Sequence, residues 1–152
     1  MRKEDFLLKK ISRITERVFQ KILKNYGIVD LNPAQFRILY ILWGNDNITI
    51  TELAKETSLE KTTLTSMLDR LEQTGNIVKK KDDKDKRKTR ILLSSNSKQL
   101  EKIYELAIEE IKSICLNGLS PADDKILRGY MEIVLDNLLR YEVEHNSANE
   151  IS

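Results

Sequence analysis

The sequence predicts a mainly helical protein with one small β-hairpin, which is an α+β fold class. Three observations support this prediction. The 152 residues include only five glycines and two prolines, so few turns are expected to interrupt long helices. Over most of the chain, apolar residues recur at steps of three and four, as they do on one face of a helix. Two short apolar runs, at residues 77–78 and 91–93, flank a charged segment and indicate the hairpin.

The composition favours one globular domain inside the cell. Forty per cent of the residues are hydrophobic and 33% are charged, which is far from a disordered composition. The single cysteine, Cys115, cannot form an intrachain disulfide, which favours a reducing compartment. No apolar run approaches the ~18 residues of a membrane span. We therefore expect a cytoplasmic protein that does not cross a membrane.

Amphipathic helices are predicted toward both ends of the chain. Residues 4–26 carry apolar side chains at helical spacing, and Gly27 follows as a helix stop. Two more helices are predicted after residue 95, separated near Gly118. The polar residues 146–152 are predicted to form a flexible tail.

These end helices are predicted to join two copies of the chain. Their apolar faces are larger than the compact middle of the chain can bury, and a symmetric dimer is the commonest assembly for such surfaces. Regions 1–30 and 95–145 are therefore predicted to form a helical dimerisation region, with residues 31–94 as the domain between them.

A helix-turn-helix is predicted within this middle domain. Thr49 and Glu52 fit a capping box that opens a short helix ending near Thr57. After a three-residue turn, a second helix runs over about residues 61–74. Its outer face carries short hydrogen-bonding side chains and cations, which suit DNA base edges and phosphates: Lys61, Thr62, Thr63, Thr65, Ser66 and Arg70. A merely solvated face is the alternative, although Thr and Ser are mediocre helix formers for that purpose.

The charged segment of the hairpin strengthens the DNA-binding prediction. Residues 79–90 hold eight basic and three acidic side chains, although the whole chain carries a net charge of only +2. A basic hairpin beside a helix-turn-helix is a winged arrangement, in which the tip contacts the DNA backbone or the minor groove. A solvated loop is the usual alternative for such a run. The predicted contacts are Lys79, Lys81, Lys84, Asp85, Lys86, Arg87, Lys88 and Arg90, with Asp85 orienting the Arg87 guanidinium.

Several motifs together resemble one protein family over nearly the whole chain. They are Leu31-Asn32-Pro33-Ala34-Gln35-Phe36, Glu52-Leu53-Ala54, Leu59 to Thr65, Leu68-Asp69-Arg70-Leu71-Glu72, Gly75, and the wing Asp85-Lys86-Arg87-Lys88-Thr89-Arg90-Ile91-Leu92-Leu93-Ser94. With them the chain resembles the MarR family of bacterial winged-helix regulators. The resemblance implies a homodimer on a pseudo-palindromic DNA site, with Arg87 in the minor groove. Lys79 and Ser58 depart from the residues frequent in the family, Arg and Gly.

The resemblance also implies a ligand crevice for a small aromatic or phenolic anion. Its candidate walls and cation are Phe19, Tyr26, Arg37, Tyr40 and Trp43, although core packing is the favoured role for most of the aromatic residues. Cys115 lies on an apolar stripe with Ile111 and Ile114, which predicts a buried, inert thiol rather than an oxidant sensor. One histidine and one cysteine give no zinc-ligand spacing, and no catalytic motif is found.

The leading interpretation is a homodimeric, sequence-specific transcription regulator, more readily a repressor than an activator. It requires no cofactor and is not an enzyme. Two alternatives remain open from the sequence: a DNA-architectural protein that responds to no ligand, and a protein-interaction module whose wing meets an acidic partner.

Overall fold

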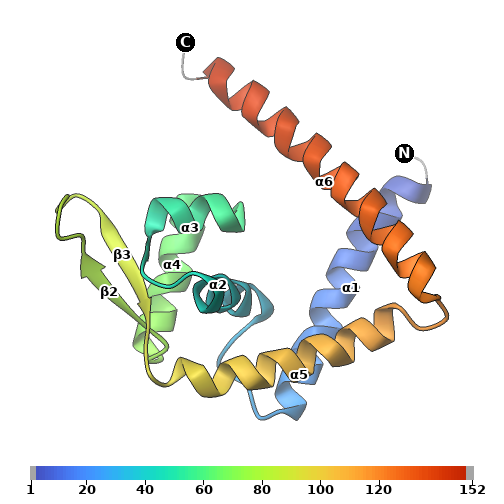
Figure 1. The fold of residues 1–152 in the computed structure, drawn as a ribbon, viewed down its shortest axis with the longest axis horizontal. Helices are drawn as coiled ribbons and strands as arrows, with labels where there is room; N and C mark the ends of the chain where they lie inside the picture. The colour runs from blue at the N-terminus through green and yellow to red at the C-terminus, as the bar shows by residue number, and fades with distance from the viewer. Residues whose placement is uncertain (1–2, 150–152) are drawn as a thin grey trace. The chain divides into compact units, whose positions relative to one another are not determined.

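The computed structural model describes residues 3–149, and the side chains of residues 6–145; the elements are helices and one small sheet (Figure 1). The chain divides into two compact units, Met1–Lys112 and Ser113–Ser152, which are described separately. The elements are α1 (Lys3–Asn25), α2 (Pro33–Gly44), β1 (Ile48–Thr49), α3 (Ile50–Thr57), α4 (Lys61–Gln73), β2 (Ile77–Lys81), β3 (Thr89–Leu93), α5 (Ser97–Cys115) and α6 (Pro121–Asn149).

Local capping explains where the central helices begin. At the start of α2, the Asn32 side chain accepts a hydrogen bond from the Gln35 backbone N–H at 2.9 Å, and the Gln35 side-chain oxygen accepts one from the Asn32 backbone N–H at 2.9 Å. Thr49 and Glu52 form the same reciprocal pair at the start of α3. These bonds satisfy backbone donors that the first helical turn leaves free. The predicted capping box is therefore confirmed.

The predicted hairpin is confirmed, and a third strand joins it. Strands β2 and β3 pair antiparallel from Ile77 opposite Leu93 to Lys81 opposite Thr89. The two-residue strand β1 pairs with the other edge of β3, so the sheet order is β1-β3-β2. The sequence did not predict β1, because two residues are too few to show an alternating pattern.

The apolar core of the first unit lies where α2, α3 and α4 meet the sheet. Its fully buried side chains include Phe36, Leu39, Leu53, Leu64 and Ile91. The C-terminal half of α1 and the middle of α5 also bury apolar side chains in this core, namely Phe19, Ile22, Leu23, Tyr104, Ala107 and Ile111. The sequence analysis assigned α1 and α5 to the dimerisation region. Parts of these two helices belong instead to the core of the first unit.

The second unit consists mainly of α6, and none of its described side chains is buried. Large apolar residues along the helix remain 38–68% exposed, among them Leu127, Tyr130, Val134 and Leu138. The helix continues to Asn149, so the backbone of residues 146–149 is helical where a flexible tail was predicted; residues 150–152 lie outside the described residues.

One sequence prediction about the end of α5 is wrong. Cys115 is exposed, not buried. The apolar stripe that predicted its burial packs into the core only as far as Ile111, and Ile114 is already 53% exposed. A periodic stripe marks one face of a helix but does not show where along the helix its packing partner ends. Within residues 3–149, no helix has the length and apolar character needed to cross a membrane.

Candidate nucleic-acid interface

The outer face of α4 presents a polar surface to solvent. Every residue predicted to form a recognition face is exposed, while Leu64, Leu68 and Leu71 anchor the opposite face in the core. A shallow groove of about 630 Å³ follows this face and is lined by Thr62, Thr65, Ser66, Asp69, Arg70, Gln73 and Thr74. The spacing of three and four residues places these side chains on one side of the helix. An exposed helix of this size fits the major groove of B-DNA.

The hydroxyl of Thr65 forms a hydrogen bond within α4. Its Oγ1 donates a hydrogen bond to the Lys61 carbonyl at 2.8 Å. The side chain therefore presents a methyl group and a hydrogen-bond acceptor rather than a free donor. A threonine methyl is suited to contact with the C5-methyl group of thymine. Ser66 makes no hydrogen bond to another described residue, so its hydroxyl can both donate and accept.

Lys79 connects the wing to the recognition helix. Its ammonium group contacts Asp69 and lies 3.7 Å from a carboxylate oxygen of Glu72. The Lys79 backbone N–H also donates to Glu72 at 3.2 Å. Only 20% of the Lys79 side chain is exposed, so the structure turns this cation toward α4 and away from the wing tip. Its ion pairs were not visible in the sequence, because the partners lie on another element.

A single buried carboxylate organises the wing tip. Asp82 accepts hydrogen bonds from the backbone N–H groups of Lys84 at 2.8 Å and Asp85 at 2.9 Å, and from the Arg90 guanidinium. These donors, with the Asp85 N–H contributing most, hold the pKa of Asp82 well below its usual range. The tip closes where the Asp82 N–H donates to the Lys88 carbonyl at 3.0 Å. The sequence analysis did not select Asp82, although aspartate followed by polar residues is a known turn former.

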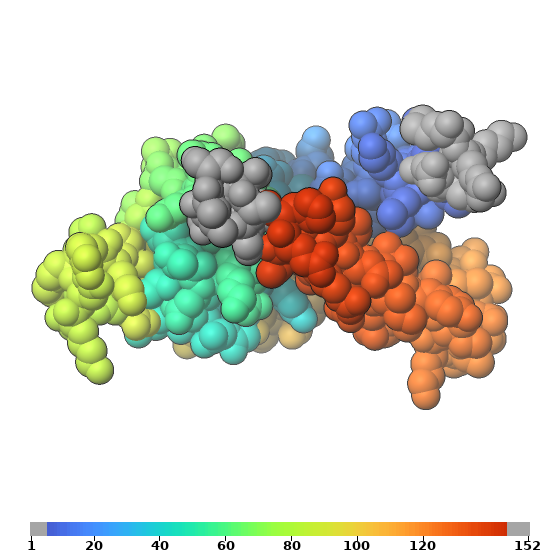
Figure 2. Space-filling model, turned by 90° about the horizontal axis from the view of Figure 1, so that it is seen from above, coloured from blue at the N-terminus to red at the C-terminus, as the bar shows by residue number. Residues whose placement is uncertain are grey.

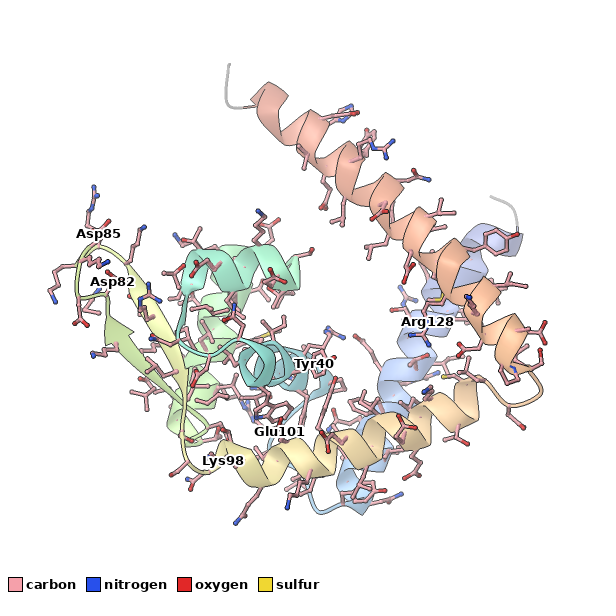
Figure 3. All side chains as sticks on the ribbon, in the orientation of Figure 1. Tyr40, Asp82, Asp85, Lys98, Glu101 and Arg128 are labelled. Atoms are coloured by element: carbon pink, nitrogen blue, oxygen red, sulfur yellow. The ribbon has the colours of Figure 1, made fainter. Side chains whose placement is uncertain are left out.

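The Arg90 side chain bonds to other residues of the protein and does not project from the wing tip. Its guanidinium binds Asp82 and also donates to the Asn47 backbone carbonyl at 2.5 Å. These contacts link β3 to the tip of the wing and to the segment that precedes α3. Figure 3 labels Asp82 and Asp85 at the tip. Arg90 was predicted to contact DNA; here both of its bonds stabilise the wing.

Arg87 is the most exposed arginine of the wing, and Asp85 holds it in place. Two guanidinium nitrogens, Nε and one terminal nitrogen, donate to the two carboxylate oxygens of Asp85 at 3.1 and 3.2 Å. The arginine side chain is still 91% exposed. These bonds confirm the predicted orientation of Arg87 by Asp85, and they lower the pKa of the Asp85 carboxyl. The remaining face of the guanidinium is free to bind an anion or a base edge.

The tip adds further positive charge around Arg87. Lys84, Lys86 and Lys88 are exposed and form no ion pair with another residue in the described part of the chain. Lys81 is exposed and only reaches the Thr89 hydroxyl at 3.5 Å. Figure 2 shows the hairpin, in yellow-green, standing out beyond the neighbouring helices of the same unit. The wing tip is therefore a basic surface of unpaired, exposed lysines with one guanidinium, that of Arg87, held by Asp85.

The residues predicted to form an anion-binding crevice do not share one site. Phe19 is buried against Tyr104, with ring centroids 5.9 Å apart. The Tyr26 hydroxyl bonds to Glu110 at 3.2 Å, and Arg37 pairs with Glu16 at 3.4 Å.

Tyr40 and Trp43 do line one cleft. They share it with Tyr104 and three glutamates of α5, residues that the sequence analysis did not select. The facing helix is distant in sequence, and no local pattern connects it to α2. Among the described residues, no group of three or more histidine, cysteine, aspartate or glutamate side chains could hold a metal ion.

Comparison with known proteins places the chain in a family. A sequence model of the MarR family matches residues 31–89, which include α3, α4 and most of the wing. The structure of reduced AbfR bound to DNA is 30% identical, has a TM-score of 0.68, and covers 88% of this chain and 90% of that chain. The chain belongs to the MarR family.

Two curated relatives match most of the chain and most of their own length. The organic hydroperoxide resistance transcriptional regulator of Bacillus subtilis is 29% identical over 88% of this chain and 87% of its own length. The HTH-type transcriptional repressor IacR of Pseudomonas putida is 26% identical over 90% and 82%, respectively. The protein is therefore a DNA-binding transcriptional regulator and not an enzyme. The predicted family and fold class are confirmed.

Proposed function

We propose that the protein is a homodimeric repressor that binds a pseudo-palindromic promoter site. The observation that carries the proposal is the geometry of the wing and of α4. An exposed Arg87 held by Asp85 and a polar recognition face lie on one compact unit, in which the ion pairs of Lys79 connect the wing to α4. Such a unit reads one half-site, with α4 in the major groove and the wing tip at the backbone or the minor groove.

The exposed apolar surface of α6 supports the homodimer. Monomeric proteins rarely leave large contiguous apolar patches in water. Most of the stability of helices in proteins comes from packing of an apolar face, yet α6, with 29 residues, has no buried side chain among those described. The N-terminal half of α1 exposes a second set of apolar side chains, Phe6, Leu7, Leu8 and Ile11. A second copy of the chain supplies the missing cover, and its two-fold symmetry gives the DNA site two matching halves.

Repression is favoured over activation on two grounds. Occupancy of a promoter excludes polymerase without any further contact, whereas activation requires an additional contact surface. One relative, IacR, carries the description of a repressor. We further propose that a small aromatic ligand releases the protein from DNA.

Sedimentation with and without DNA tests the assembly. We expect the free protein to sediment at twice its chain mass of 17.7 kDa and to bind one duplex as a dimer. Leu135→Asp, on the apolar surface of α6, should yield monomers with at least tenfold weaker DNA binding, because an unpaired buried charge opposes association. The neighbouring Asp136→Ala serves as the matched control. A monomeric wild-type protein, or a dimer unaffected by Leu135→Asp, would contradict the proposed interface.

A further inference from the structure

Arg90 lies between two parts of the first unit that are far apart in sequence. Its guanidinium Nε donates to a carboxylate oxygen of Asp82, and a terminal nitrogen donates to the Asn47 backbone carbonyl. A DNA phosphate would have to compete with these two acceptors for a side chain that is only 35% exposed. Loss of the bond would also leave the Asp82 side chain, which is 9% exposed, without its cation, and an unpaired buried charge is costly.

The two carboxylate oxygens of Asp82 bind different parts of the wing. Oδ2 accepts the bond from Arg90, whereas Oδ1 accepts from the backbone N–H groups of Lys84 and Asp85 at 2.8 and 2.9 Å. Asp85 in turn accepts two guanidinium bonds from Arg87. Both aspartates lie at the outer end of the hairpin (Figure 3). A continuous series of hydrogen bonds therefore connects Arg90 to Arg87 through the two aspartates.

The segment that precedes α3 is bonded to the same strand, β3, at further points. The Asp46 carboxylate accepts hydrogen bonds from the Leu93 backbone N–H at 2.8 Å and from the Asn47 N–H at 2.7 Å. Asn47 has a φ of +59°, a left-handed conformation that is uncommon for residues with a side chain. Thr49, the N-cap of α3, lies opposite Arg90 in the sheet. The start of α3 is therefore placed relative to β3, and Arg90 extends this connection to the wing tip.

We propose that Asp82 and Arg90 are positioning residues of the wing, which hold Arg87 in place relative to the helix-turn-helix and do not bind DNA themselves. The inference rests on the proposed contact of Arg87 with DNA. It reverses the simple electrostatic expectation for Asp82. Removal of a carboxylate from a surface that meets phosphates removes a repulsive charge and should strengthen DNA binding. If Asp82 holds the wing tip, its replacement weakens DNA binding although the positive charge of the wing rises.

Two neutralising variants test this reversal by fluorescence anisotropy, on a labelled duplex that the wild-type protein retains from a pool of genomic fragments. We expect Asp82→Asn to bind about fivefold or more weakly than wild type, the lower end of the loss for an arginine that reads DNA. Asp83→Asn removes the same charge from the next residue, whose side chain is 80% exposed and pairs with Lys80 at 3.8 Å. This control should bind at least as tightly as wild type. Equal or tighter binding by Asp82→Asn would overturn the proposal.

Arg90→Lys separates positioning from a phosphate contact. Lysine keeps the charge, so a residue that only neutralises a phosphate should lose little affinity on this change. One ammonium group cannot reproduce the planar guanidinium that reaches both Asp82 and the Asn47 carbonyl. We therefore expect Arg90→Lys to bind about fivefold or more weakly than wild type. Affinity equal to wild type would overturn the proposal. Urea titrations followed by Trp43 fluorescence show whether each variant folds, and Arg90→Lys decides the test if Asp82→Asn does not.

A double-mutant cycle connects the loss of affinity to Arg87. In the wild-type background, Arg87→Ala should weaken DNA binding roughly 5- to 150-fold. In the Asp82→Asn background the same change should cost less than about twofold, because the arginine is already displaced. Equal losses in both backgrounds would show that Asp82 does not act through Arg87 and would overturn the proposal. No loss in the wild-type background would instead refute the proposed contact of Arg87 with DNA, and the positioning role with it.

Discussion

Arg87→Ala is the change that most directly tests the role of the wing. The Arg87 side chain is 91% exposed, and its side-chain bonds among the described residues are those to Asp85. Its removal should therefore change the free energy of unfolding by less than about 0.5 kcal/mol. Loss of an arginine that reads DNA costs about 1–3 kcal/mol, which corresponds to roughly 5- to 150-fold in affinity. The expected result is a large loss of DNA binding without a loss of stability.

Arg87→Lys separates charge from geometry at the same position. Lysine keeps the positive charge but cannot form the two parallel bonds to a carboxylate that arginine forms with Asp85. We expect intermediate affinity, with a dependence on salt close to that of wild type. The assay is fluorescence anisotropy at two salt concentrations. Its labelled duplex carries the DNA site that the protein retains from a pool of genomic fragments.

A matched control and a refuting result complete this test. Arg37 is also an exposed, ion-paired arginine of the first unit, but it lies on α2, so Arg37→Ala should leave DNA affinity unchanged. Unchanged affinity of Arg87→Ala at both salt concentrations would remove the wing tip from the mechanism.

Three further predictions concern stability and the thiol. Phe36→Ala should lower the free energy of unfolding by about 3–5 kcal/mol in urea titrations, because Phe36 is fully buried and stacked on Tyr104; a loss below about 1 kcal/mol would contradict its place in the core. Glu52 and Asp82 have lowered pKa values in the folded protein, so their contribution is complete above their ordinary pKa values of 4.5 and 3.8 and is lost as pH falls below them. The urea midpoint should therefore begin to drop near pH 4.5 and continue to drop below pH 3.8 toward the depressed folded-state pKa of Asp82, and an Asp82→Asn variant should show a smaller drop below pH 3.8. Cys115→Ser should leave the melting temperature unchanged, and the native thiol should react with a thiol reagent without denaturant.

Local signals in the sequence were sufficient for most of the fold. The bonds of Asn32 with Gln35 and of Thr49 with Glu52 join residues three positions apart, so they are visible as short motifs. Asp85 and Arg87 are separated by two residues, and their interaction was likewise predicted. Helical periodicity is also a local signal, and it located α1, α4, α5 and α6.

Features that depend on distant partners were not predictable in this way. Lys79 pairs with carboxylates ten and seven residues away on another element, and Arg90 binds a carbonyl 43 positions away. The aromatic cluster around Tyr104 joins α1, α2 and α5. Strand β1 exists only because β3 pairs with it. In each case the sequence shows the residue but not its partner, because the tertiary fold brings the two together.

Selection of bound DNA tests the central claim most directly. The full-length protein is mixed with a pool of genomic duplex fragments at two salt concentrations, and the retained fragments are sequenced. We predict a shared inverted repeat among them, with retention that falls steeply as salt rises because cations of the wing and of α4 displace counterions from phosphates. Retention without a common sequence would contradict sequence-specific regulation and favour an architectural role. No retention at either salt concentration would contradict DNA binding by the wing and direct attention to an acidic protein partner.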